Sequence, residues 1–108
     1  MFKGTVVENS LVDKKVLESI NIEKTYQSGD WILYDVLVNE QQIVRLSKSL
    51  ANGSWYMHFW EPGNDDIKVV FRNKIFDIKF SDKSTWTDAV AYGKSIGIPD
   101  EQLDFLIN

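Results

Sequence analysis

The sequence predicts an α+β domain: an antiparallel meander sheet of about six strands, with one N-terminal helix and two C-terminal helices packed on one face. Three observations carry this prediction. Residues 55–60 (WYMHFW) are rich in the aromatic side chains typical of strands. Residues 67–71 and 75–80 alternate apolar and polar side chains with a period of two. Helix-start signals cluster near the two ends of the chain.

Composition limits the class of protein. The chain has 108 residues, of which 44% are hydrophobic, so we expect one domain spanning 1–108. It has no cysteine, which excludes disulfides, thiolate metal sites and a cysteine nucleophile. The start MFKGTVVE resembles neither a signal peptide nor a membrane span, so we expect a cytoplasmic protein with no membrane contact. A net charge of -4 argues against binding nucleic acid.

The sequence of the N-terminal third predicts a strand, a helix and a hairpin. Residues 3–8 fit a short strand, and Ser10 can cap a helix over 10–19. Gly29-Asp30 predicts the turn of a hairpin between 20–28 and 31–38. Pairing Ser28 with Trp31 sets Ile22 opposite Leu37.

The same register places Lys24 directly across from Asp35. We interpret this polar pair as a cross-strand ion pair worth about 0.2 to 1 kcal/mol, with a catalytic couple as the alternative.

The middle of the chain contains the weakest signals. Asn39-Glu40 predicts a turn that leads into an extended segment over 41–46. Residues 47–53 fit a single helical turn ended by Gly53. A two-residue turn at Asn73-Lys74 would place Phe71 opposite Phe76.

Helices are expected at the C-terminal end. Residues 81–84 provide capping side chains for a helix over 85–96, which Gly97 ends. Pro99 fits the first position of a final helix over 99–107.

The register of the aromatic strand decides which of its side chains are buried. Placing Trp55, Met57 and Phe59 beside the apolar side chains of 67–71 leaves the single histidine outside the core. The opposite face would then carry a mixed aromatic and charged set: Tyr56, His58, Trp60, Lys68, Val70, Arg72, Asp77 and Lys79.

An interaction face follows from this register, formed by Tyr56, His58, Trp60 and Arg72. Exposed aromatic side chains beside an arginine have the composition of a binding hot spot. His58 titrates near neutral pH and fits a general base, a ligand contact or a simple surface residue. No catalytic residue, metal site or cofactor is assigned, because the chain has no second histidine, no nucleophile elbow and no glycine-rich phosphate loop.

The first functional hypothesis is therefore a non-enzymatic protein-interaction or regulatory module. It would bind a protein partner, or its own copy, through the aromatic sheet face or an exposed edge strand. The alternative is a small-ligand-binding domain or minor enzyme, with a pocket between sheet and helices that holds His58 or the Lys24 and Asp35 pair. A third hypothesis, an acidic protein that occupies a basic nucleic-acid-binding surface, rests only on charge and size.

Overall fold

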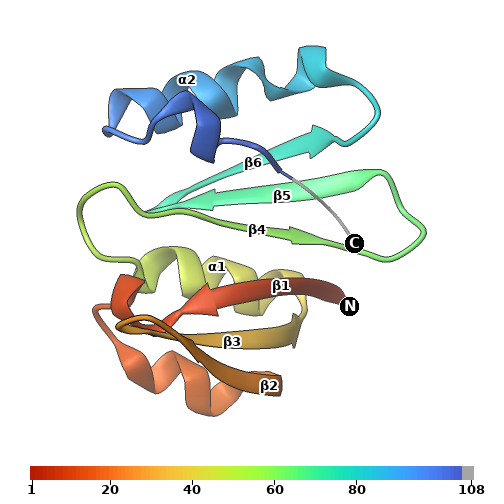
Figure 1. Cartoon of the computed structure of the whole chain (residues 1–108). Coiled ribbons are helices and arrows are strands. Elements are labelled where there is room, and N and C mark those ends of the chain that lie inside the picture. Colours follow the sequence, from red (N-terminus) through yellow and green to blue (C-terminus); the bar gives the residue numbers. More distant parts are fainter. Residues whose placement is uncertain (106–108) are drawn as a thin grey trace.

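The computed structural model describes residues 1–105 as an α+β domain built on one six-stranded antiparallel sheet (Figure 1). Class, strand number and antiparallel pairing agree with the prediction. The strands are β1 (Phe2–Val7), β2 (Asn21–Ser28), β3 (Trp31–Val38), β4 (Met57–Trp60), β5 (Asp66–Phe71) and β6 (Lys74–Lys79). Their spatial order is β2-β3-β1-β4-β5-β6, so the predicted meander is wrong.

The meander fails because β1 lies in the middle of the sheet. β1 pairs with β3 from Phe2↔Val38 to Val7↔Leu33 and with β4 at Gly4↔Phe59. A Cβ atom at position 4 would lie 2.3 Å from a ring carbon of Phe59, so only glycine leaves room for that ring. The connection from β3 to β4 crosses β1. As a result, β1 pairs on both sides with strands that are distant from it in the sequence, β3 and β4.

That connection contains α1 (Glu40–Ser49), where the sequence predicted a turn and an extended segment over 41–46. The helix begins with a capping box: the Asn39 side chain accepts from the Gln42 amide at 2.9 Å, and the Gln42 side chain accepts from the Asn39 amide at 2.9 Å. It buries Ile43 and Leu46 against the sheet. The capping box, and not the β-branched side chains, decides the local structure.

The other helices also differ from the prediction. In place of a helix over 10–19 there are two 3-10 helices, η1 (Glu8–Ser10) and η2 (Lys14–Ser19), and Asp13 caps the second. η3 (Lys83–Trp86) and α2 (Thr87–Ser95) overlap the predicted helix over 85–96. The predicted helix over 99–107 is reduced to η4 (Asp100–Gln102), and its last two positions lie outside the described residues.

Two hydrophobic cores occupy opposite faces of the sheet. The first packs α1 against β1, β3 and β4, and its buried members include Val6, Val36, Val38, Ile43, Leu46, Leu50, Met57, Phe59 and Val70. The second packs α2 and the C-terminal segment against β5 and β6, with Ile67, Val69, Phe71, Ile78, Trp86, Ala89, Ile98, Leu103 and Phe105 buried. Figure 1 shows α2 beside β6 at one end of the sheet and β2 at the other end.

The register of β4 is the reverse of the one predicted. His58 lies opposite Val69 and Trp60 opposite Ile67, so the even-numbered side chains of the aromatic strand join the second core. Met57 and Phe59 are buried in the first core. Because both faces of this strand are covered, by the α1 side on one face and by the segment around Phe105 on the other, its hydrophobic pattern could not distinguish the two registers.

The two hairpins follow the prediction in part. The β5–β6 turn is Arg72-Asn73, one residue earlier than expected, so Phe71 pairs with Lys74 and not with Phe76. In the β2–β3 hairpin, Ser28↔Trp31 is confirmed.

Lys24 and Asp35 are also paired across the β2–β3 hairpin, as predicted. A β-bulge between Ile22 and Lys24 then shifts Ile22 opposite Val36, where Leu37 was expected.

Candidate functional site

The predicted aromatic strip forms a stack, but it is half-buried. The ring centroids of Tyr56 and His58 are 6.4 Å apart, and those of His58 and Trp60 are 5.5 Å apart. Phe105 packs on this stack, at 5.7 Å from Tyr56 and 6.0 Å from His58. Burial raises the pKa of the Tyr56 phenol, whose hydroxyl donates to the Gln102 carbonyl. The strip therefore borders the second core and is not the free face that was predicted.

Arg72 does not join the aromatic strip. It lies in the β5–β6 turn, and its Nε donates to the Leu50 carbonyl at 3.1 Å. The four residues of the predicted interaction face are thus divided between two places.

Within residues 1–105, the sheet face beside the aromatic strip is covered by neither hydrophobic core. Directly paired residues share a face, and the pairs Lys3↔Trp60, Lys3↔Leu37 and Thr5↔Asp35 extend the Trp60 face onto β1 and β3. We call this surface the open half-face; it comprises Lys3, Thr5 and Val7 of β1, Lys24 and Tyr26 of β2, and Leu33, Asp35 and Leu37 of β3.

The open half-face is left uncovered in the described residues because the second core ends at β4. The described helix α2 and the segment around Phe105 pack on β4, β5 and β6. Val7, Leu33 and Leu37 are half-buried and belong to neither core. This surface therefore combines apolar side chains with a polar centre.

Asp35 is that polar centre. The Thr5 hydroxyl donates to its Oδ1 at 2.9 Å, and the Tyr26 hydroxyl donates to the same oxygen at 3.3 Å. Lys24 lies across from Asp35 as predicted, but its Nζ sits 5.3 Å from the centroid of the Tyr26 ring. Within residues 1–105, no ion pair joins Lys24 to Asp35. The predicted register is correct, and the predicted ion pair is not formed.

A pocket of about 280 Å³ lies at Asp35. Its lining residues come from four neighbouring strands: Lys3, Gly4, Thr5, Glu23, Tyr26, Asp35, Val36 and Trp60. The structure thus brings together Asp35 and Trp60, which the sequence had placed in separate candidate sites. The Trp60 Nε1 atom is buried and has no hydrogen-bond acceptor in the described part of the chain. Two carboxylates and two aromatic rings suit this pocket to a cationic group.

Sequence reasoning missed Lys3, Thr5, Glu23 and Tyr26 as members of this site. Thr5 could be found only by knowing that β1 inserts beside β3, 30 positions away. The local signal was the alternation of 3–7, which places Lys3, Thr5 and Val7 on one face.

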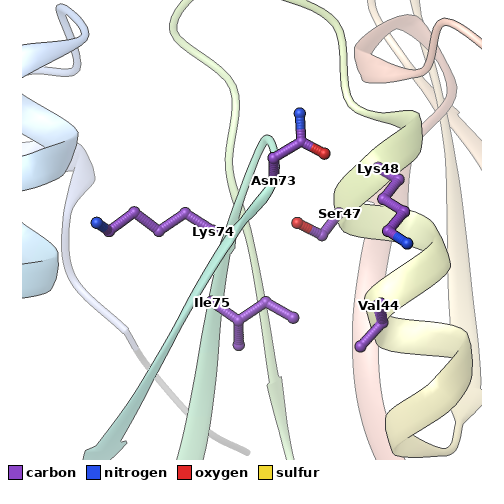
Figure 2. Close-up of a pocket in the computed structure, with 6 residues that line it drawn as sticks. All are labelled: Val44, Ser47, Lys48, Asn73, Lys74 and Ile75. Carbon is purple, nitrogen blue, oxygen red and sulfur yellow. The ribbon is translucent and has the colours of Figure 1, made fainter.

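A second pocket, of about 340 Å³, lies between α1 and the β5–β6 turn (Figure 2). Val44 and Ile75 face each other across it. Lys74 points away, and its Nζ lies over the rings of Phe76 and Tyr92, at 5.4 and 5.2 Å from their centroids. This pocket sits between sheet and helix, as the ligand-binding hypothesis expects, but contains neither His58 nor the Lys24 and Asp35 pair.

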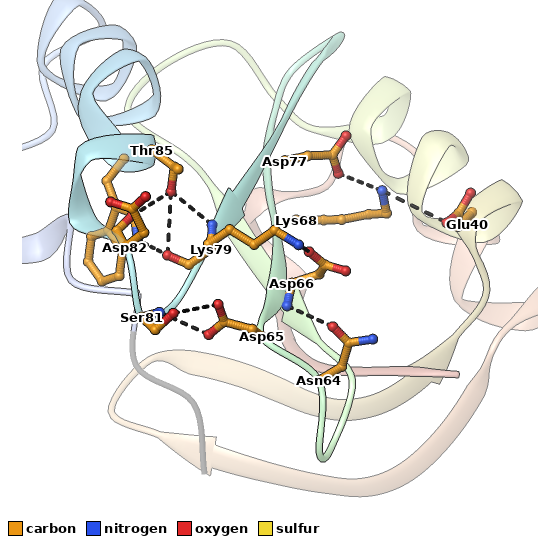
Figure 3. Close-up of polar contacts among 11 residues, drawn as sticks. Glu40, Asn64, Asp65, Asp66, Lys68, Asp77, Lys79, Ser81, Asp82 and Thr85 are labelled. Carbon is orange, nitrogen blue, oxygen red and sulfur yellow. Dashed lines mark hydrogen bonds and ion pairs between the residues drawn. The ribbon is translucent and has the colours of Figure 1, made fainter.

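The charged residues around β5 and β6 are engaged with one another (Figure 3). Lys68 pairs with Asp77 at 2.6 Å, and Lys79 pairs with Asp66. The Asp66 carboxylate raises the pKa of Lys79. These ion pairs join β5 to β6 across directly paired positions. Among residues 1–105 no group of three potential metal ligands is found.

The loop before β5 is fixed to the segment after β6 by Asp65. Its carboxylate accepts from the Ser81 hydroxyl at 2.6 Å and from the Ser81 amide at 2.9 Å. These bonds lower the pKa of Asp65. Asp65 therefore serves as a structural acceptor.

No helix in the described residues is long and apolar enough to cross a membrane. No protein-family model matches the chain, and no curated protein or solved structure shows significant similarity to it.

Proposed function

We propose that the chain is a non-enzymatic protein-interaction module that binds a partner protein through the open half-face. One observation carries the proposal: the adjacent strands β1 and β3 present apolar side chains, Val7, Leu33 and Leu37, that belong to neither core. Covering such a surface with a partner stabilises the complex by roughly 25 cal/mol per Å² of apolar area removed from water. A cytoplasmic location is part of the same proposal and rests on the sequence.

The polar centre also supports binding over catalysis. Both hydroxyl donors are directed to one oxygen of Asp35, an arrangement that holds a carboxylate in position to accept further donors. Apolar side chains around a polar centre provide both the affinity and the register of an interface.

A charge in the apolar part of the half-face tests the proposal. Leu37→Glu places a carboxylate among its apolar side chains, and Val44→Glu is the matched control, since Val44 is 42% exposed on α1, on the opposite side of the sheet. Partners captured from host extract by the wild-type protein are quantified against both variants after each is shown to be folded. We expect a partner that Leu37→Glu loses and Val44→Glu retains. Equal capture by all three proteins would contradict the proposal.

A small-ligand-binding domain is the second candidate function. The pocket between α1 and the β5–β6 turn favours it, because its apolar walls, Val44 and Ile75, line about 340 Å³. Val44→Trp fills this pocket, so it should abolish ligand-induced thermal stabilisation in a metabolite screen. A ligand that stabilises wild type and Val44→Trp equally would exclude this pocket.

A further inference from the structure

We propose that the pocket at Asp35 receives an arginine side chain of the partner protein. This inference rests on the proposed function, because it names the group that the partner inserts into the open half-face. The lining of the site includes the carboxylates Asp35 and Glu23 and the aromatic side chains Tyr26 and Trp60.

The first step of the argument is the state of Asp35. Both hydroxyl donors, from Thr5 and Tyr26, use Oδ1. In the described residues no donor to Oδ2 is found, and no cation lies within ion-pair distance. Lys24, the cross-strand cation, is directed at the Tyr26 ring. A half-buried carboxylate that neutral groups hold in place is stabilised further by a cationic N–H donor.

The second step is the choice of cation. A guanidinium is planar, carries five N–H donors and stacks on aromatic faces, whereas an ammonium is a compact, strongly hydrated charge. The lining offers two carboxylates, Asp35 and Glu23, and two rings, Tyr26 and Trp60. A guanidinium can engage acceptors and a ring face at the same time, so this lining favours arginine over lysine.

The third step concerns Lys3, which also lines the pocket. Its ammonium is a like charge to the incoming guanidinium and weakens binding. Neutralising Lys3 should therefore strengthen binding, and neutralising Asp35 should weaken it. A carboxylate outside the pocket, such as Asp77, should have no effect on binding, and this difference from Asp35 distinguishes the site from a nonspecific attraction to an acidic chain.

The experiment uses small probes, so it needs no partner protein. N-acetylarginine amide is titrated into the full chain and followed by amide and indole NMR signals. N-acetylcitrulline amide is the neutral control of the same shape, and N-acetyllysine amide is the ammonium control. We expect shifts confined to the pocket, at Thr5, Tyr26, Asp35 and the Trp60 indole, for the arginine probe. Equal shifts with citrulline, or equal affinity for lysine, would overturn the inference.

The variants test the residues. Asp35→Asn should weaken binding of the arginine probe about tenfold, the loss expected for one charge-assisted hydrogen bond. Lys3→Gln should tighten it about threefold, since it removes a screened like charge. Asp77→Asn is the matched control, because it removes a carboxylate at Lys68, outside the pocket, and should leave binding unchanged. If Asp35→Asn does not fold, Lys3→Gln alone decides: unchanged or weaker binding refutes the site.

Failure here is distinguishable from failure of the proposed function. If the arginine probe does not bind but Leu37→Glu still abolishes partner capture, the half-face is an interface and the arginine subsite is wrong. If the probe binds but partner capture is unaffected by Leu37→Glu, the pocket exists and the protein-interaction role is wrong, which also removes the partner as the source of the arginine.

Discussion

Replacing Gly4 with alanine tests the arrangement that places β1 in the centre of the sheet. The added Cβ would lie 2.3 Å and 2.7 Å from two ring carbons of Phe59 and 2.8 Å from the His58 carbonyl oxygen. Phe59 is fully buried, so its ring has no free space to enter. The carbonyl belongs to the backbone before Phe59, so relieving that contact requires β4 to move away from β1.

The size of the effect follows from two opposing terms. Overpacking in a well-packed core costs about 1–3 kcal/mol, and more where the backbone must shift. Alanine recovers about 0.5–1 kcal/mol relative to glycine within a strand. Two close ring contacts and one backbone contact put Gly4→Ala at the upper end of the overpacking range, so we expect a net loss of at least about 2 kcal/mol in the free energy of unfolding.

Urea unfolding followed by tryptophan fluorescence measures this loss. Gly29→Ala is the control, because nothing lies within 4 Å of its added Cβ and its φ of +61° costs only the left-handed conformation, about 1 kcal/mol. A Gly4→Ala protein as stable as the wild type, or more stable than Gly29→Ala, would refute the central placement of β1.

Three further predictions concern the site, a helix and pH. Trp60→Phe keeps a ring in the stack and removes a buried indole N–H that has no acceptor within residues 1–105, so urea unfolding should place it within about 1 kcal/mol of wild type. Trp60→Ala should cost over about 2 kcal/mol, and equal losses for both would contradict this reasoning. Asn39→Ala removes the α1 cap and should lower the free energy of unfolding by about 1 kcal/mol, whereas Asn39→Ser should retain most of it. The hydrogen bond from the Tyr34 hydroxyl lowers the pKa of Glu8, and the bonds from Ser81 lower the pKa of Asp65, so the stability that these carboxylates contribute is present above their ordinary pKa values and lost as pH falls through the lowered ones. Glu8 raises the pKa of Tyr34, and Asp66 raises the pKa of Lys79, so the stability that these two groups contribute is present below their ordinary pKa values and lost as pH rises through the raised ones. The free energy of unfolding, measured by denaturation across pH, should be constant between about pH 5 and pH 9 and fall on either side. Glu8→Gln disrupts the bond to the Tyr34 hydroxyl and should reduce the fall at both acidic and alkaline pH. An unchanged pH dependence would exclude this pair as a cause of the fall.

Fold class, strand number and the turn of the β2–β3 hairpin were the parts of the fold that the sequence could predict. Gly29-Asp30 set the β2–β3 register, and Lys24 meets Asp35 as expected. The register of β4 could not be predicted, because Phe59 on one face and Trp60 on the other both contact a core. Periodicity identifies a buried face only when the other face is polar.

The candidate site was predictable only in fragments. Asp35 and Trp60 were both identified, for reasons that turned out to be incomplete. What joins them is β1, whose Thr5 binds Asp35 and whose Lys3 pairs with Trp60. Pairing between segments so distant in sequence depends on tertiary packing, which no local pattern encodes.

The central position of β1 has a consequence for synthesis on the ribosome. β1 is made before the other strands of this sheet, and it can pair with β3 once residue 38 has emerged, but its second neighbour ends at Trp60. At 5–20 residues per second, the 22 positions between Val38 and Trp60 correspond to roughly 1–4 s of translation. During that interval β2, β3 and β1 can form a three-stranded sheet, in which the edge of β1 that later meets β4 is unpaired and the ring of Phe59 does not yet lie over Gly4. We expect a stalled chain ending near residue 54 to bind chaperones, and one that includes the whole sheet to be released from them.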